Sequence, residues 1–220
     1  TAEAGRFICQ ADRSLTQSNE ATLVLDICAA GGYARADTFV LGLGQVPILL
    51  VDDDGLASAD LDVERAVSAL GYRHRKWDQR RQGPVTAAEM ARYDLVFWHG
   101  GALGSISPFT SAQQDAIAGH LAAGGRLLMA GANLVSDLWQ AGDSLDRRFC
   151  QEVLHLSYAA TLPATTILSG VAGDPIGHGL SLALNGLGSA TNHDGVTEVQ
   201  PAAGAVGCLQ AAAGREVGLR

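Results

Sequence analysis

The sequence predicts an α/β fold in which a parallel sheet carries helices on both faces, preceded by a few strands of a different kind. Short apolar runs at 48–52, 94–98 and 126–130 have the length and composition of buried strands. Segments with helical spacing of apolar residues separate these runs, and such alternation is typical of parallel sheets. Before residue 45, strand-like runs follow one another with no helix between them.

Composition excludes several classes of function. The chain has 220 residues, of which 47% are apolar and 17% charged, as expected of a globular protein with a sizeable core. Its net charge of −8 disfavours binding to nucleic acid or to an anionic membrane. No apolar run reaches the roughly 18 residues of a membrane helix, so we expect no membrane insertion. The start of the chain shows no signal peptide.

The cysteines do not form a metal motif. They stand at 9, 28, 150 and 208, without a C-x-x-C pair, so a zinc site is not predicted. We expect free, buried thiols, because cysteine is among the most buried residue types. A disulfide between Cys9 and Cys28 is the alternative.

Residues 1–45 have the pattern of the last strands of a β-sandwich domain. The runs RFICQ, ATLVLDICA and DTFVLGL alternate with the turn-like stretches RSLTQSNE and GGYARA. The segment GLGQVP (42–47) then predicts a linker into a second domain, 46–220. Because the chain begins inside strand-like sequence and ends without a closing helix, we expect it to be a piece of a longer protein.

The second domain begins with the strand 48–52, and a helix is predicted across 58–71. Its inward face is expected to carry Val63, Ala66, Val67 and Leu70, with Gly71 as the stop. A strand at 72–78 follows. Two further helices are predicted from capping-box spacings, Thr86/Glu89 and Ser111/Gln114, and the second is expected to turn Ile117 and Leu121 inward. A third is predicted from the helical spacing of Phe149, Val153 and Leu156. Weaker strands are predicted at 165–170 and 205–210.

Three aspartates, Asp52 to Asp54, follow the first strand of this domain, where open α/β sheets place their sites. A phosphate-accepting receiver also requires an aspartate after the third strand and a lysine after a later one. Here those strands end in Trp98-His99 and Ala130-Gly131. A cation site on Asp53 and Asp54 is a weaker alternative, because a hard cation needs about six oxygen ligands. We therefore expect the aspartates to bind loop backbone and cap the next helix, with no metal and no cofactor.

The ordered segments PILLVDDDG, ALGYRHRKWD, YDLVFWHGG, LAAGGRLLMAGANL and GDPIGHGL resemble the class I glutamine amidotransferase-like domains of large secreted bacterial proteins. The resemblance covers about residues 46–210 and implies a flavodoxin-like fold. Members of the family place a cysteine nucleophile at a sharp strand-to-helix turn, in the pattern G-x-C-x-G. In this chain the matching residues are Gly131 to Val135, which puts Asn133 at the nucleophile position. The His-x-Glu pair of the family is missing as well.

A parallel sheet gathers the ends of its strands at one edge, so we predict a binding crevice of Asp53, Asp54, His99, Gly100, Gly101 and Asn133. In this crevice His99 either bonds to loop backbone or acts as a general base with Asp53 or Asp54. A carboxamide at position 133 is a poor nucleophile. No catalytic residue is therefore assigned.

The sequence predicts a non-catalytic accessory module of an extracellular or cell-surface bacterial protein, with an architectural role or a role in binding a partner or a glycan. Its expected partners are other domains of the same parent chain, such as a protease or a glycan-binding domain. Two alternatives remain: a hydrolase or amidase that uses His99 with Asp53 or Asp54, and, more remotely, a degenerate receiver-like domain. The ligand, the parent protein and the oligomeric state are not specified by the sequence.

Overall fold

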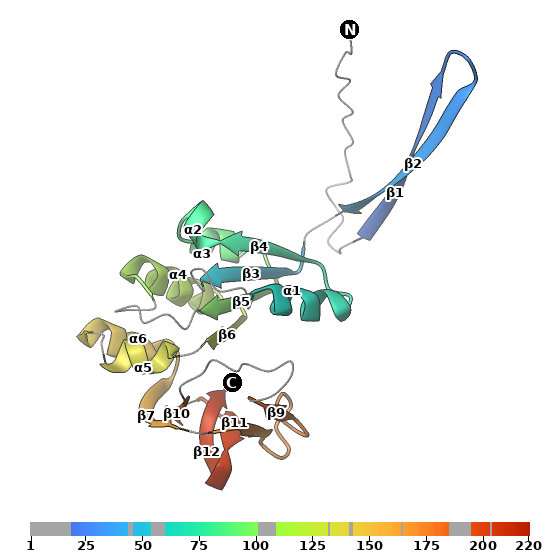
Figure 1. The fold of residues 1–220 in the computed structure, drawn as a ribbon. Coiled ribbons are helices and arrows are strands. Elements are labelled where there is room, and N and C mark those ends of the chain that lie inside the picture. Colours follow the sequence, from blue (N-terminus) through green and yellow to red (C-terminus); the bar gives the residue numbers. More distant parts are fainter. Residues whose placement is uncertain are drawn as a thin grey trace.

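A computed structural model describes residues 19–43, 46–53, 60–100, 109–131, 133–140, 143–163, 165–184, 195–202 and 204–220. Along the chain it contains a β-hairpin, a parallel sheet with helices, and a set of antiparallel strands (Figure 1). The mixed α/β architecture predicted from the sequence is confirmed, with antiparallel sheets in addition. Within the described ranges, no helix has the length and apolarity needed to cross a membrane.

The hairpin consists of β1 (Asn19–Ala29) and β2 (Tyr33–Leu43), which pair antiparallel along their whole length. The turn between them includes Gly31 and Gly32, whose φ angles of 90° and 82° favour glycine. The predicted break at GGYARA is shorter than expected, because β2 already starts at Tyr33. The expected strand RFICQ lies outside the described residues, and the assignment of residues 1–45 to a β-sandwich stays a prediction.

The parallel sheet has the order β4-β3-β5-β6, formed by β3 (Ile48–Asp53), β4 (His74–Asp78), β5 (Leu95–Gly100) and β6 (Leu127–Gly131). All four predicted strands are present within two residues of their expected bounds. This is the order of the first four strands of a flavodoxin-like sheet. The chain leaves β3 to one side for β4 and returns to the other side for β5, so a crevice is expected where β3 and β5 end.

Helices cover both faces of the parallel sheet. The main core lies on one face, where Val51 and Trp98 pack with residues from the helices after β4, β5 and β6. The opposite face is covered in part by the first helix, whose Val63 lies near Leu50 and Phe97. The helices are α1 (Asp60–Ala69), α2 (Gln79–Gln82), α3 (Ala87–Met90), α4 (Ser111–Ala122), α5 (Leu134–Gln140) and α6 (Ser144–Glu152).

Two helix predictions need correction. Ala66 and Leu70 were expected to face inward, but both are exposed, Leu70 by 74%. The helix α1 ends at Ala69, before Leu70, and its side toward the sheet carries the charged Asp60 and Glu64. The N-cap of α4 is Thr110 rather than Ser111. Its hydroxyl oxygen accepts a hydrogen bond from the Gln113 backbone N–H, and the Thr110 backbone N–H donates one to the side-chain oxygen of Gln113.

The last third of the chain is antiparallel, in contrast to the predicted continuation of the α/β pattern. Leu156, expected on a helix, starts β7 (Leu156–Leu162), because α6 ends at Glu152. β7 pairs with β10 (Val196–Pro201), and a separate sheet has the order β12-β11-β8-β9. Its strands are β8 (Ile167–Gly170), β9 (Ser181–Ala183), β11 (Gly207–Ala211) and β12 (Arg215–Leu219), of which β8 and β11 match predicted strands.

Candidate functional site

Strand alternation divides the predicted crevice between the two faces of the sheet. In the register of β3 and β5, Asp52 stands beside His99, and Asp53 stands beside Gly100. Because successive side chains of a strand point to opposite faces, Asp52 and His99 share the α1 face, and Asp53 lies on the other. The structure therefore does not bring Asp53 and His99 together. Asp54 and Gly101 lie outside the described residues.

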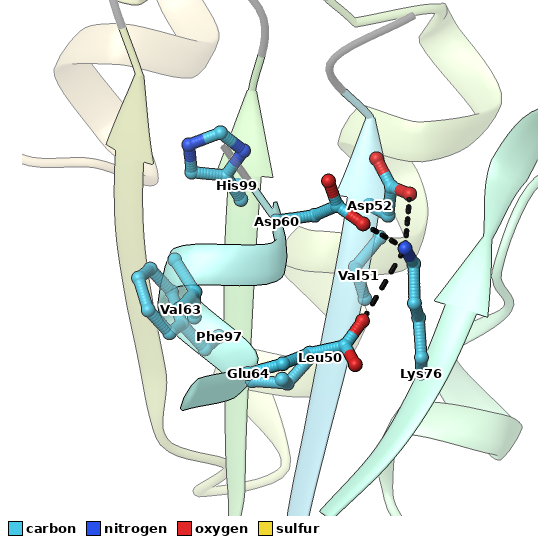
Figure 2. A pocket seen from close by; sticks show the side chains of 9 residues that line it. All are labelled: Leu50, Val51, Asp52, Asp60, Val63, Glu64, Lys76, Phe97 and His99. Carbon is cyan, nitrogen blue, oxygen red and sulfur yellow. Dashed lines mark hydrogen bonds and ion pairs between the residues drawn. The ribbon is translucent and has the colours of Figure 1, made fainter. Parts of the chain in front are cut away.

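On the α1 face, the ammonium group of Lys76 lies among three carboxylates (Figure 2). Lys76 Nζ is 3.0 Å from Asp52 Oδ2 and 3.3 Å from Glu64 Oε1, and it forms a further ion pair with Asp60. Desolvation opposes the charge of Lys76, but the bonds to Asp60 and Asp52 outweigh it and raise the pKa of the amine. This cluster joins β3, β4 and α1 and leaves an excess of two negative charges.

The cluster borders a small hollow with an apolar floor. Leu50, Val63 and Phe97 line the floor, and His99 stands at its end, as Figure 2 shows. The space within the hollow, counting the part that opens to solvent, is about 220 Å³. Burial lowers the pKa of His99, while the negative charges of Asp52 and Asp60 oppose this shift. The imidazole is therefore largely neutral at pH 7 and able to accept a proton or a hydrogen bond.

On the opposite face, Asp53 is surrounded by neutral donors. Its Oδ2 accepts a hydrogen bond from Trp98 Nε1 at 3.2 Å and one from Gln113 Nε2 at 3.3 Å. Burial raises the pKa of Asp53 to about 6, although the bonds from Trp98 and Gln79 lower it, and the charge of Asp52 adds to the rise. The carboxyl group thus links β3 to β5, α2 and α4.

The turn from β6 into α5 is sharp and places Asn133 at its apex. Asn133 has a φ of 62°, in the left-handed region, and α5 starts at the next residue. Its carbonyl accepts bonds from Asp137 N–H at 2.8 Å and from the Ser136 hydroxyl at 3.0 Å. A residue with positive φ between a strand and a helix also occurs at the nucleophile elbow of α/β-hydrolases.

Glycines at two positions allow the elbow to form. A Cβ atom at Gly131 would lie 2.5 Å from the carbonyl oxygen of Gly100, and one at Gly100 would lie 2.6 Å from Leu134 Cδ2. Strands β5 and β6 and the start of α5 can approach this closely because neither glycine has a side chain. Gly100 of the predicted crevice therefore has a packing role against Leu134 at the start of α5.

The cysteines of the described residues are remote from this chemistry. Cys150 is fully buried in the core, and burial, together with the charge of Asp146, raises its pKa to about 12. Cys208 is buried as well, whereas Cys28 is a free, exposed thiol on the hairpin, contrary to the expected burial. Among the described residues no group of three or more His, Cys, Asp and Glu side chains is arranged to hold a metal ion.

Sequence reasoning missed the Lys76 cluster. Asp60 and Glu64 are four residues apart on the predicted helix, and Lys76 is the sole lysine of the chain. The helical spacing alone places the two acids on one face. From the sequence, the third acid, Asp52, was expected to act as one group with Asp53 and Asp54. The alternation of side chains along β3 instead turns Asp52 and Asp53 to opposite faces of the sheet.

Comparison with known proteins adds little to this description. No family model matches the chain, and no curated protein matches it. A crystal structure described as that of a ThuA-like protein from Bacteroides uniformis superposes with a TM-score of 0.49 and 13% identity, covering 76% of this chain and 69% of the other. A similarity this low carries no conclusion about function. The assignment of residues 48–131 to a flavodoxin-like α/β fold depends on their own strand order and connections.

Proposed function

We propose that this chain is a non-catalytic accessory module of a larger extracellular or cell-surface bacterial protein, and that the carboxyl edge of its parallel sheet binds a glycan. The observation that carries the proposal is Asn133. A strained strand-to-helix turn, which in hydrolytic α/β enzymes presents a nucleophile, here presents a carboxamide. An amide side chain both donates and accepts hydrogen bonds, which suits the hydroxyl groups of a sugar but not attack on a carbonyl.

The surroundings of Asn133 support a binding role. The neighbouring strand β5 carries His99 just before its last residue, Gly100, and the neutral imidazole of His99 is also both donor and acceptor. Beyond it, Asp52 and Asp60 supply carboxylate oxygens, and Phe97 and Leu50 supply an apolar surface. Carboxylates, amides and an apolar floor at one sheet edge are the mixture that a small polar ligand requires.

One observation favours a second function, that of a hydrolase or amidase of the amidotransferase-like superfamily. His99 is held neutral by burial and has Asp52 and Asp60 as acidic neighbours. A neutral histidine beside a carboxylate is suited to act as a general base. The acid available to it is Asp52 rather than Asp53, which points to the opposite face.

The proposal is tested by turnover and binding on the same purified chain. We expect the wild-type chain to release nitrophenol from nitrophenyl acetate, and ammonia from L-glutamine, at the same rates as a His99→Ala variant. Calorimetry with a panel of soluble oligosaccharides is expected to find a ligand whose binding is lost in Asn133→Ala. Gln140→Ala, at the exposed far end of α5, is the matched control and should bind normally. Saturable turnover that is abolished by His99→Ala would instead establish the enzyme.

A further inference from the structure

One face of the β1–β2 hairpin is apolar and uncovered. Because the two strands pair antiparallel, with Leu23 opposite Phe39 and Ala29 opposite Tyr33, the odd-numbered residues share one face. We call this set the apolar hairpin face; it consists of Leu23, Leu25, Ile27, Tyr33, Phe39 and Leu41, with Arg35 and Asp37 between them. Phe39 is 49% exposed and Tyr33 is 55% exposed.

The rest of the described chain does not cover this face. β1 and β2 make extensive contact only with each other, and the hairpin stands apart from the parallel sheet in Figure 1. A two-stranded hairpin is marginally stable in water on its own. The exposed apolar area on this face is on the order of 500 Å², a size that marks interaction sites on soluble proteins.

We propose that the apolar hairpin face packs against the same face of a second copy of this chain, so that two hairpins form a small β-sandwich. The two copies are related by a two-fold axis that lies midway between the two hairpins, runs perpendicular to their strands and passes at the level of Asp26 and Ala36. This axis sets which residues of the two copies face each other. Leu25 then faces the partner's Ile27, and Phe39 faces the partner's Tyr33. Two copies together bury on the order of 1,000 Å², the lower limit for a specific interface.

Charge complementarity favours a second copy as the occupant. Arg35 and Asp37 lie two residues apart on the same face and form an ion pair of 2.8 Å within the chain. Under the proposed axis, Arg35 faces the partner's Asp37 and Asp37 faces the partner's Arg35, so that each charge gains a second opposite neighbour. A surface with equal and opposite charges at mirrored levels is complementary to itself.

The other face of the hairpin does not have this property. Its apolar residues Val24 and Val40 are 60% and 61% exposed, but the level of the axis carries Asp26. Packing that face on itself in the same register would bring Asp26 against the partner's Asp26. Like charges so placed are repulsive, and this face is left to solvent.

The test is sedimentation velocity of the 220-residue chain across micromolar concentrations. We expect a reversible dimer that Phe39→Asp weakens at least roughly tenfold. Val40→Asp, the neighbouring change on the other face, should leave the dissociation constant unaltered. Arg35→Asp and Asp37→Arg should each dissociate the dimer, since like charges then face each other across the axis.

Mixing the two charge variants decides the register. A copy with Arg35→Asp carries two acids and a copy with Asp37→Arg carries two bases, so a heterodimer restores both opposite pairs. We expect the mixture to dimerise where each variant alone does not, an outcome that damage to a single hairpin cannot produce. A chain that stays monomeric, a dimer that is indifferent to Phe39→Asp, or a mixture that remains monomeric would each overturn the proposal.

Discussion

The indole of Trp98 donates a hydrogen bond of 3.2 Å to the carboxylate of Asp53, and this pair links the ends of β5 and β3. Trp98 is fully buried, and the donors around the acid are uncharged. A carboxylate in such surroundings gains hydrogen bonds but loses hydration. Burial prevails, so that the folded protein holds the pKa of Asp53 at about 6, well above its value in the unfolded chain.

Stability should therefore depend on pH through Asp53. A raised acid pKa means that its contribution is fully present below the unfolded value near 3.8 and is lost as the pH rises through about 6. We expect Asp53→Asn to remove a loss of about 1–2 kcal/mol between pH 4 and pH 7, a figure reduced because solvent partly screens this half-buried group. The amide oxygen of the variant can still accept from Trp98. Urea denaturation of both proteins at several pH values measures the difference. The exposed Asp115→Asn on α4 is the control and should keep the wild-type slope.

Lys76→Met should destabilise the domain at pH 7. The variant leaves Asp52, Asp60 and Glu64 together without their counter-charge. A fully buried pair would lose about 3–5 kcal/mol, but Lys76 is 33% exposed, so a loss of about 1–3 kcal/mol is expected. Thermal melting at pH 7 measures it, and Lys76→Arg should retain most of the stability. A Lys76→Met variant as stable as the wild type would contradict this account.

The elbow glycines should differ in their tolerance of a methyl group. Gly131→Ala would bring Cβ against the backbone oxygen of Gly100, which cannot move without shifting a strand, and should cost about 1–3 kcal/mol. Gly100→Ala would meet only the tip of the Leu134 side chain and should cost less. In α4, the Cβ atom added by Gly119→Ala would lie an ordinary 3.5 Å from Ala87 Cβ, so the free energy of unfolding of this variant should not fall. Urea unfolding of the three variants gives the order.

Alkylation should distinguish the thiols. Cys28 is exposed on the hairpin face that carries Val24, so iodoacetamide should modify it within minutes in the native protein. Cys150 and Cys208 are buried, and burial raises the pKa of both thiols, so their modification should await unfolding. Isotope-coded alkylation before and after denaturation, read by mass spectrometry, compares the three sites. Equally rapid labelling of Cys150 and Cys28 would contradict the buried position of Cys150.

The parallel sheet was predictable because three of its strands, β3, β5 and β6, contain compact apolar runs with their own boundary signals. The fourth, β4 (HRKWD), is mostly polar and was placed by its position between two helical segments. The strands β9, β10 and β12 were missed because they lie in a glycine-rich part of the chain, where pairing partners rather than local periodicity decide the conformation. The strand β7 was missed because its first residue, Leu156, continues the helical spacing of Phe149 and Val153. Thr110 and Ser111 are both N-cap residue types, and only the backbone conformation shows which of them caps α4.

The candidate site was predictable where it depends on the chain's local conformation and not where it depends on which way a side chain points. Asn133 was singled out by the resemblance of residues 131–135 to a family motif, and the structure gives it a φ of 62° just before α5. The expected pairing of His99 with Asp53 does not occur, because the register makes Asp52 the neighbour of His99 and turns Asp53 to the other face. Its alternative partner, Asp54, lies outside the described residues. The role of Lys76 requires three elements to be brought together in space, which no local pattern reveals.

The alternation of Asp52 and Asp53 has an evolutionary consequence. Two adjacent codons specify acids whose environments share almost no neighbours, so selection can modify one side of the sheet while the other keeps its chemistry. A single-codon insertion just before Asp52 would instead move that acid to the place beside Trp98 and leave its place beside Lys76 to the inserted residue. We therefore expect descendants of this sequence to tolerate replacement of either acid more readily than any change in the length of β3.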